Sequence, residues 1–410
     1  MNAITKQLTG LRDWVDDRFP LMQLWNDHMG QYYAPKNFNF WYYFGVLSIV
    51  VLAIQILTGI WLTMNYKPDA GLAFASVEYI MRDVEWGWLI RYMHSTGASA
   101  FFIVVYLHMF RALLYGSYKK PRELLWVLGM FTYLALMAEA FLGYLLPWGQ
   151  MSFWGAQVII SLFGAIPFVG ETLSLWIRGD FVVSDITLNR FFALHVIAVP
   201  LAIIGLVFLH ILALHEVGSN NPDGVEIKKN KGPDGKPVDG IPFHPYYTVK
   251  DSVGVIVFLI VFAGVVFFAP EMGGWFLEAN NFVPANPLVT PEHIVPVWYF
   301  TPFYAILRAV PDKLIGVLLM GGATTILFLL PWLDRSPVKS IRYRGPIFKT
   351  ALTLFVISFV SLGYLGTQNP TTTMTWMARG FSVIYFGFFL LMPFYSKMDK
   401  TKPVPDRVTG

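Results

Sequence analysis

Eight long apolar runs dominate this sequence, and each is long enough to cross a membrane as a helix. An α-helix rises about 1.5 Å per residue, so about 20 apolar residues cover the roughly 30 Å of a bilayer core. Backbone polar groups inside a bilayer need internal partners, which a helix supplies. The runs therefore predict an all-α integral membrane protein with eight spans, at about 40–63, 91–111, 124–145, 186–214, 251–269, 313–333, 347–366 and 376–396.

Two of these runs each carry two histidines. His94 and His108 are fourteen positions apart, a spacing that returns to within about 40° of the same helix face after a rise of about 21 Å. His195 and His210 are fifteen apart, and we expect Pro200 to kink that helix and absorb part of the mismatch. If both helices run in the same direction, His94 faces His195 and His108 faces His210.

Two opposed neutral imidazoles form a ligand set for a heme iron, so two levels of histidines predict a four-helix bundle with two stacked hemes b. A single membrane histidine is equally well explained by a hydrogen bond to a neighbouring helix. Two matched pairs favour the heme interpretation, because ionisable residues inside a membrane are costly and usually functional.

The composition agrees with a membrane protein and excludes several other classes. Of the residues, 55% are hydrophobic and only 14% are charged, and the net charge is +4. The lysines and arginines lie in loops, so we expect no nucleic-acid surface. The chain has no cysteine. Disulfides, thiolate-bound iron–sulfur clusters and covalently attached c-type heme are therefore excluded within it, and any such centre must lie on a partner.

Four segments between or before the spans have their own character. Residues 1–35 are charged throughout, which favours a short amphipathic helix on the membrane surface over a signal peptide. A short helix is expected within 66–87. Residues 147–184 predict one or two helices packed on the outer face, and 270–311 a proline-rich segment that does not span. The apolar face of the N-terminal helix would consist of Leu8, Leu11, Val15 and Phe19.

Basic residues gather in loops that eight spans place on one side of the membrane. The positive-inside rule makes that side the cytoplasm and puts both termini there. His94 and His195 then form the periplasmic level, and His108 and His210 the cytoplasmic one. The basic residues are Lys119, Lys120, Arg122, Lys228, Lys229, Lys231, Lys236, Arg335, Lys339, Arg342, Arg344, Lys397, Lys400 and Lys402.

Glycines repeat at the spacing of the first histidine pair: Gly45 with Gly59, and Gly129 with Gly143. Such pairs predict helices left bare where a porphyrin edge approaches, although small residues also mediate ordinary helix packing in membranes. Three arginines lie three to five residues from a histidine, at the depth where heme propionates would end: Arg91, Arg111 and Arg190. Arginines that extend to the membrane surface are the alternative interpretation.

Four further motifs complete a resemblance. They are GYLLPWGQMSFWGA (143–156), LHEVGSNNPDG (214–224), IPFHPYYTVKD (241–251) and PVWYFTPFYAILR (296–308). With the four histidines, the sequence resembles cytochrome b of the quinol:cytochrome c oxidoreductase, the bc-type complex, over almost its whole length. The long charged insertion before the third motif is similar to bacterial forms, and the fifteen-residue histidine spacing to the chloroplast-type branch.

The resemblance implies a Q-cycle that builds a proton gradient. Quinol would be oxidised near the periplasm, with one electron leaving to a Rieske-type iron–sulfur protein and the other crossing through two hemes b to reduce quinone near the cytoplasm. A c-type cytochrome subunit, membrane lipid and a homodimeric complex in the bacterial inner membrane are further implications. The domains would be 1–215 with the hemes, a cytoplasmic loop 216–250, and 251–410, which contributes to the oxidation pocket.

The resemblance also implies residues of the quinol-oxidation pocket: Phe141, Tyr144, Gly155, Pro296, Trp298, Tyr299 and Tyr304. Core packing is the simpler interpretation of Trp298. The family usually has a glutamate where this chain has Val297, and valine cannot accept a proton. Glu278 is the first candidate to replace it, although a solvated loop carboxylate is its simplest interpretation. Glu139, inside a span, is the second, and Glu292 the third.

The quinone-reduction pocket implied by the resemblance would use His215, Ser219, Lys250 and Asp251. His215 can hydrogen-bond a quinone carbonyl, while Asp251 and Lys250 can supply protons from the cytoplasm. Without the resemblance, His215 is equally well a histidine stabilised by the helix C-terminus. Two other functions remain open on the residues alone: a di-heme anchor for a dehydrogenase or hydrogenase, and a transporter with a histidine proton relay and no heme.

Overall fold

The computed structural model describes residues 3–409, and helices account for nearly all of its regular structure. Within that range, seven helical segments are long and apolar enough to cross a membrane, and a bent pair at the C-terminal end makes an eighth when counted as one span. This confirms the all-α membrane fold. The spans are Phe40–Thr63, Gly87–Tyr115, Glu123–Leu145, Asp185–Val217, Phe243–Phe268, Lys313–Leu333, Pro346–Thr367, and Thr372–Leu390 with Met392–Met398.

The eighth span differs from its expected bounds. Helix α16 begins at Thr372 and ends at Leu390, and α17 (Met392–Met398) continues at an angle of 63°. Pro393 lies in the first turn of α17. Because proline has no backbone N–H and its ring clashes with the preceding turn, the helix cannot continue straight through this position. The apolar run therefore predicted the span but not its bend.

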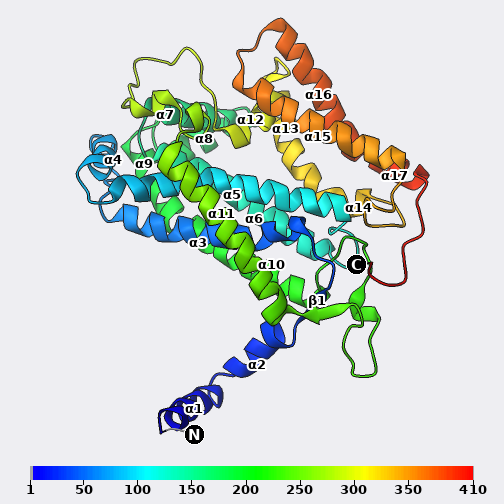
Figure 1. The fold of residues 1–410 in the computed structure, drawn as a ribbon. Helices are drawn as coiled ribbons and strands as arrows, with labels where there is room; N and C mark the ends of the chain where they lie inside the picture. Colours follow the sequence, from blue (N-terminus) through cyan, green and yellow to red (C-terminus); the bar gives the residue numbers. More distant parts are fainter. Residues whose placement is uncertain (1–2, 410) are drawn as a thin grey trace.

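The N-terminal half is built from two helix pairs. Helix α3 (Tyr43–Thr63) packs along α5 (Gly87–Tyr115), and α6 (Glu123–Leu145) packs along α10 (Val199–Val217). Close backbone approaches between one pair and the other are few. The bundle is therefore held open along its centre, and α11 (Thr248–Phe268) packs against the outside of α3 and α5 (Figure 1).

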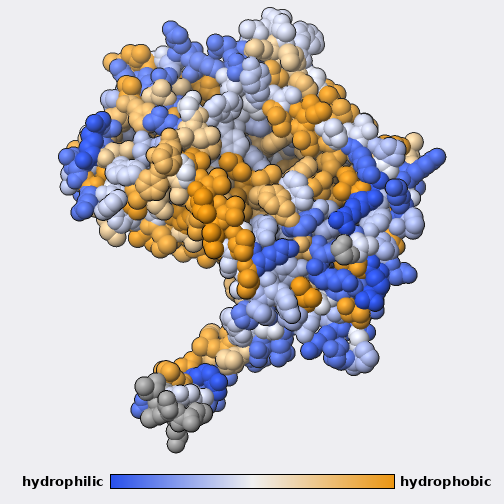
Figure 2. All heavy atoms as spheres, in the orientation of Figure 1, coloured by the Kyte–Doolittle hydropathy of each residue, from blue (hydrophilic) through white to orange (hydrophobic). Residues whose placement is uncertain are grey.

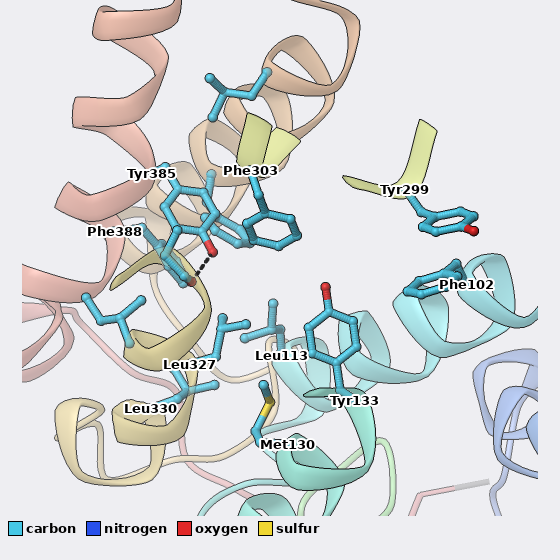
Figure 3. Packing of buried hydrophobic residues seen from close by; sticks show 14 of the residues in the cluster. Phe102, Leu113, Met130, Tyr133, Tyr299, Phe303, Leu327, Leu330, Tyr385 and Phe388 are labelled. Atoms are coloured by element: carbon cyan, nitrogen blue, oxygen red, sulfur yellow. Dashed lines mark hydrogen bonds between the residues drawn. The ribbon is translucent and has the colours of Figure 1, made fainter. Parts of the chain in front are cut away.

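The second half packs around a short helix. Helix α12 (Thr301–Arg308) does not span; it contacts α13 (Lys313–Thr325), α15 (Pro346–Thr367) and α16. One apolar core joins these helices to α3, α5 and α6. Figure 3 shows part of this core, in which the Tyr385 hydroxyl donates a hydrogen bond to the carbonyl of Ala323. In the same view Tyr299 lies flat on Phe102, with ring centroids 3.8 Å apart.

The segments between the spans form short elements. They are α1 (Ala3–Asp16), α2 (Leu21–Trp25), α4 (Ala73–Arg82), α7 (Gln150–Phe163), α8 (Gly170–Arg178), and strands β1 (Tyr33–Pro35) and β2 (Gly240–Pro242). Two other short helices belong to spans: α9 (Asp185–Ala193) begins the fourth, and α14 (Leu330–Leu333) ends the sixth. The strands pair antiparallel, with Ala34 opposite Ile241. Helices α1 and α2 extend away from the body of the molecule, and Leu8, Leu11 and Phe19 are exposed (Figure 1).

The outer surface fits a membrane environment. Large apolar side chains are exposed along α10 and α11, among them Phe208, Val257 and Ile260. Figure 2 shows apolar residues gathered over the middle of the visible face and hydrophilic residues toward its margins. An apolar surface this extensive is typical of a face that contacts lipid or another subunit.

The helix with the second histidine pair contains one irregular turn. Residues Leu194–Ala198 form a π-helical turn, in which the Val199 N–H donates to the Leu194 carbonyl five residues back. A π turn holds one residue more than an α turn. Pro200 lies two residues after this turn and has no N–H to donate to the Val196 carbonyl, which disfavours a regular α-helix here. The extra residue of the fifteen-residue spacing is thus absorbed by this turn, where the sequence predicted a proline kink.

Candidate functional site

The four histidines of the two apolar runs meet in pairs at the centre of the bundle. The rings of His94 and His195 have centroids 6.2 Å apart, and those of His108 and His210 are 6.4 Å apart. Two bonds of about 2.0–2.1 Å, typical of metal–imidazole ligation, plus roughly half a ring on each side separate two ligand rings by about 6 Å. Both pairs therefore stand at a spacing that accommodates one iron between the rings.

Each glycine of the two fourteen-residue pairs lies against one of these histidines. A Cβ added to Gly45 would lie 3.4 Å from Cε1 of His108, and one added to Gly59 would lie 3.2 Å from Cε1 of His94. On α6, a Cβ added to Gly129 would lie 3.1 Å from Cε1 of His210, and one added to Gly143 would lie 2.4 Å from Cε1 of His195. The glycines therefore leave room for the imidazoles themselves. A side chain at Gly143 would collide with the ring.

Two cavities surround the histidine pairs. The upper cavity, around His94 and His195, has a volume of about 390 Å³, and the lower cavity, around His108 and His210, about 380 Å³. One residue from each helix lines both cavities and separates them: Leu52, Phe101, Leu136 and Ile203. Along α3, α5 and α6 these residues stand midway between the two levels, seven positions from each, or about 10 Å of helix rise.

Hydrogen bonds orient the upper histidines. Nδ1 of His94 lies 2.9 Å from the Thr58 hydroxyl, which itself donates to the Ile54 carbonyl. The hydroxyl has one proton to give, so His94 must be the donor at Nδ1. Nδ1 of His195 lies 3.0 Å from the Glu139 carbonyl and 3.0 Å from its carboxylate. Both rings then keep Nε2 free as a lone-pair donor, the arrangement usual for a metal-binding histidine.

The lower level carries more positive charge. Arg111 lines the cavity, where one guanidinium nitrogen lies 3.3 Å from Nδ1 of His108 and another donates to the Ser117 hydroxyl at 3.3 Å. Nδ1 of His210 is buried without a hydrogen-bond partner among the described residues. Arg122 also lines this cavity. The guanidinium of Arg122 is occupied by Glu226, so Arg111 is the group here that suits an anion such as a propionate.

The three predicted arginines divide between two environments. Arg91 lines the upper cavity and Arg111 the lower one. Arg190 is exposed, and its guanidinium donates to the Trp176 carbonyl. Five residues separate Arg190 from His195, and five residues turn a helix by about 500°, so the two side chains point in different directions. The structure does not bring Arg190 to either cavity.

Beside the upper cavity, a tyrosine meets a carboxylate. The Tyr144 hydroxyl donates to Oε2 of Glu278 at 2.9 Å, although 134 residues separate them. Burial raises the pKa of Glu278 to about 7, against the lowering effect of this hydrogen bond. A Cβ added to Gly155 would meet only Cε1 of Tyr144, at 3.8 Å. Glu278 is therefore a half-buried, hydrogen-bonded group rather than a solvated loop carboxylate.

The other residues predicted for the oxidation pocket are more dispersed. Tyr299 lines the upper cavity, with its pKa raised by burial, and Val297 is buried beside it. Trp298 donates to the Ser99 hydroxyl and packs against the core, and the Tyr304 hydroxyl donates to the Ile294 carbonyl. Trp298 and Tyr304 are not among the residues that line the upper cavity, and neither are Gly155 and Glu278. The same holds for half-buried Phe141, which packs on Phe191, for half-buried Pro296 and for exposed Glu292.

The residues predicted for a quinone-reduction pocket all line the lower cavity. His215, Ser219, Lys250 and Asp251 come from α10, the following loop and α11. The ammonium of Lys250 donates to the Phe38 carbonyl at 2.6 Å. The structure thus places these four residues in the same cavity as the lower histidine pair.

Several residues around the cavities were not singled out by sequence. Gln55 lines the upper cavity, and its amide nitrogen has no partner among the described residues. Asn220 lines the lower cavity and donates to the Tyr115 carbonyl. Arg122 was counted only as a basic loop residue, although it is buried and paired with Glu226. The position of Asn220 inside the motif LHEVGSNNPDG was the one available signal.

Two family models match the chain. Residues 29–218 match "Cytochrome b/b6/petB", and residues 284–386 match "Cytochrome b(C-terminal)/b6/petD". The first covers all four paired histidines, and the second covers the segment from the loop before α12 to α16.

Similar proteins match nearly end to end. Cytochrome b of Allochromatium vinosum is 67% identical over 97% of this chain and 98% of its own length, and cytochrome b of Rickettsia prowazekii is 51% identical over 98% of both. Cytochrome b/c1 of Bradyrhizobium diazoefficiens is 48% identical over 97% of this chain but only 56% of its own length. A solved structure titled "Hyperthermophilic respiratory Complex III" aligns with a TM-score of 0.87 and 41% identity, over 94% of this chain and 98% of that one.

Proposed function

Since this chain belongs to the cytochrome b family, we propose that it is the di-heme subunit of a quinol:cytochrome c oxidoreductase that runs a Q-cycle. It would oxidise quinol at one membrane face, pass electrons through two hemes b, and reduce quinone at the other face. Family membership favours this function over both alternatives, the dehydrogenase anchor and the heme-free transporter.

The observation that carries the proposal is the stacking of two histidine pairs across the bundle. Each pair stands at ligand spacing, each ring lies against a glycine, and each pair has its own cavity. When bound, heme b supplies reversible one-electron transfer. His94 and His195 would hold the upper heme, and His108 and His210 the lower one. Arg91 at the upper level and Arg111 at the lower would pair with propionates.

The Tyr144–Glu278 pair is the proposed acid–base group for quinol oxidation. Glu278 would take the role that the valine at position 297 cannot, because a carboxylate whose pKa is about 7 is poised to accept a proton at neutral pH. Tyr144 would orient it through the hydrogen bond from its hydroxyl. Gly155 would allow a quinol ring to approach the Tyr144 ring, because no side chain fills that space.

Quinone reduction is proposed for the lower cavity. His215 would hydrogen-bond the quinone carbonyl, with Ser219 beside it. Lys250 and Asp251 lie at the start of α11, next to the hydrophilic loop, and would admit protons from the aqueous phase.

Sidedness and partners follow from charge and chemistry. The basic loops next to the lower cavity support the proposal that this face lies on the cytoplasmic side of a bacterial inner membrane, with both termini there. The chain has no cysteine, so the acceptor of the first quinol electron is proposed to be a Rieske-type iron–sulfur protein, followed by a c-type cytochrome subunit. The exposed apolar faces would contact lipid and a second copy of the complex.

Heme content and ligand substitution test this function directly. We would measure a pyridine hemochrome and a reduced-minus-oxidised spectrum of the purified protein, beside His195→Leu and His210→Leu. Two protohemes per chain are expected, with a different spectral component lost in each variant. Absence of heme, or a single heme indifferent to both substitutions, would contradict the proposal.

A further inference from the structure

A second histidine, His28, contacts His215, the histidine proposed to bind quinone. His28 lies in the π-helical turn Asn26–Gly30, and its Nδ1 is 2.9 Å from Nδ1 of His215 in the last turn of α10. The two ring centroids are 4.8 Å apart, with the ring planes tilted by 33°. The contact joins residues 187 positions apart, so it is formed by the tertiary fold.

The contact restricts the protonation of both rings. A neutral imidazole has one N–H and one lone pair, and two N–H groups at 2.9 Å would repel each other. One proton is therefore shared between the two Nδ1 atoms. When His28 donates it, neutral His215 must carry its own proton on Nε2. Neither Nε2 has a hydrogen-bond partner within residues 3–409.

The two rings face different surroundings. His215 lines the lower cavity, whereas His28 is not among the lining residues and is half-buried in the N-terminal segment. Tyr32 holds the edge of the His215 ring, with centroids 4.7 Å apart, and its hydroxyl lies 3.4 Å from that of Ser219. His215 is thus fixed from two sides, and His28 connects it to the outside of the cavity.

The other charged side chains near His28 and His215 do not compete for the proton that the two rings share. Lys228 donates to the backbone carbonyls of His215 and Glu216, and Arg122, Lys250 and Asp251 line the lower cavity. Asp27 is exposed next to His28. Among the described residues, no carboxylate forms a hydrogen bond or ion pair with either ring. The imidazole of His28 is therefore the group that contacts Nδ1 of His215.

We propose that His28 is a positioning and proton-relay residue that passes protons from the aqueous phase to His215 during quinone reduction. This inference rests on the proposed function. A proton binds Nε2 of His28, the Nδ1–H bond of His28 breaks as an Nδ1–H bond forms on His215, and the Nε2–H bond of His215 breaks as an O–H bond forms on the quinone carbonyl oxygen. When bound between His108 and His210, a heme would supply the electrons for this reduction. Exchange of the ring protons with water then restores the starting tautomers of both histidines.

The test follows oxidation of the lower heme by quinone in the purified, pre-reduced complex. Decylubiquinone and menadione are each mixed with wild type, His28→Gln, His28→Ala and His244→Gln. A glutamine amide can donate a hydrogen bond to Nδ1 of His215 but cannot pass a proton on. His244 is the matched control, because it is an exposed histidine near the same segment that packs on Trp25 rather than on His215.

We expect oxidation to slow at least about tenfold in His28→Gln, at an unchanged half-saturating quinone concentration, because positioned proton transfer contributes about 10²–10⁴-fold to rates. His28→Ala should be equally slow and recover with added imidazole, while His244→Gln behaves as wild type. A wild-type rate in His28→Gln would overturn the relay and leave a positioning role. No change in either His28 variant would overturn both roles.

Heme content separates these outcomes from misfolding and from failure of the proposed function. Variants that retain two hemes are folded, and if His28→Ala loses heme, His28→Gln decides the question alone. If neither quinone oxidises the lower heme of the wild-type complex, the proposed function fails, and the inference about His28 fails with it. If wild type reacts and both His28 variants react at the wild-type rate, only the inference about His28 is overturned.

Discussion

Of the four glycines that face a histidine, Gly143 lies closest to its ring. Its substitution is therefore the sharpest test of whether these glycines make room for the histidines. Alanine is worth about 1 kcal/mol more than glycine inside a helix. In Gly143→Ala, however, the new Cβ would lie 2.4 Å from Cε1 of His195 and must displace the ring. We expect loss of most of the upper heme signal and retention of the lower one, measured by pyridine hemochrome and redox spectra.

A glycine on the same bundle serves as the control for Gly143. Gly205 lies on α10, where a Cβ would meet nothing within 4 Å. Gly205→Ala should keep both hemes. Equal heme content in Gly143→Ala and Gly205→Ala would show that the glycine at 143 is not required for the histidine position.

Glu278 should impose a pH dependence on quinol oxidation. Its pKa is raised to about 7, and the carboxylate that accepts a proton is present only above that value, so the wild-type rate should rise with pH through about 7. In Glu278→Gln this rise should vanish and the rate fall at least about tenfold. In Tyr144→Phe the rise should move to higher pH, because the hydrogen bond that lowers the pKa is lost.

The matched control for this pH profile is Glu292→Gln. Glu292 is an exposed carboxylate in the same proline-rich segment, so its substitution should leave the profile unchanged. A wild-type profile in Glu278→Gln would contradict the assignment, and quinol oxidation assayed with a soluble c-type acceptor is the measurement that decides.

The positions of site residues could be predicted where the pattern lay within one helix. Contacts between segments far apart in the sequence could not be predicted. The fourteen-residue spacings gave the histidine levels and the glycines that face them, because both are properties of a single helix. The contact of Tyr144 with Glu278 spans 134 residues, and that of His28 with His215 spans 187, so no local pattern contained them. Arg190 was judged by sequence distance alone, which ignores direction around the helix.

At the scale of elements, the π turn before Pro200 explains the odd histidine spacing. The partners on α6, Gly129 and Gly143, are fourteen apart, whereas His195 and His210 are fifteen apart. One π turn at Leu194–Ala198 holds the extra residue and keeps both histidines in register with their glycines. Removal of the extra residue should therefore be tolerated.

We therefore predict that a chain lacking Ala198 and carrying Pro200→Ala keeps both hemes. Ala198 is exposed and lines neither cavity, and without the proline a regular α-helix can close over fourteen residues. The control is deletion of Ile103 from α5, which has no π turn and should lose at least one heme, because a deletion rotates one histidine by about 100°. Loss of heme in both chains would contradict the role of the π turn.

The length of each apolar run predicted that a spanning helix exists there. It did not predict the bends and irregular turns within the helices. Seven of the eight runs became spanning helices and the eighth became the bent pair α16–α17, because about 20 apolar residues have one stable form in a bilayer. The bend between α16 and α17 and the π turn both lie beside a proline, which signals a break but not whether the helix bends or adds a residue.

At the scale of the whole molecule, a group of ion pairs ties both halves of the chain at the lower cavity. Arg122, before α6, donates to both carboxylate oxygens of Glu226 at 2.6 and 2.9 Å and to the Gly218 carbonyl at 2.9 Å. Lys339, between α14 and α15, binds the same carboxylate. Three segments far apart in sequence therefore meet at one carboxylate, that of Glu226. The sequence showed their charges but not their partners, since loop charges were assigned only to a membrane face.

This group should make the complex sensitive to acid. Burial opposes the charge of Glu226, but hydrogen bonds from Arg122, reinforced by Lys339, lower its pKa from 4.5 to about 2. A carboxylate with a lowered pKa contributes its full stabilisation above the unfolded value and loses it as pH falls. The melting temperature should therefore decline between about pH 4.5 and 2.

Glu226→Gln should reproduce that loss at neutral pH. Arg122 would remain buried without its charge partner, and breaking a buried pair typically costs about 3–5 kcal/mol. We expect a lower melting temperature at pH 7 and a flatter acid decline than in wild type, followed by thermal loss of heme absorbance. Glu216→Gln, at an exposed carboxylate ten residues upstream, should melt as wild type does. A wild-type melting temperature in Glu226→Gln would mean that the junction is held by the core between the halves rather than by this charge.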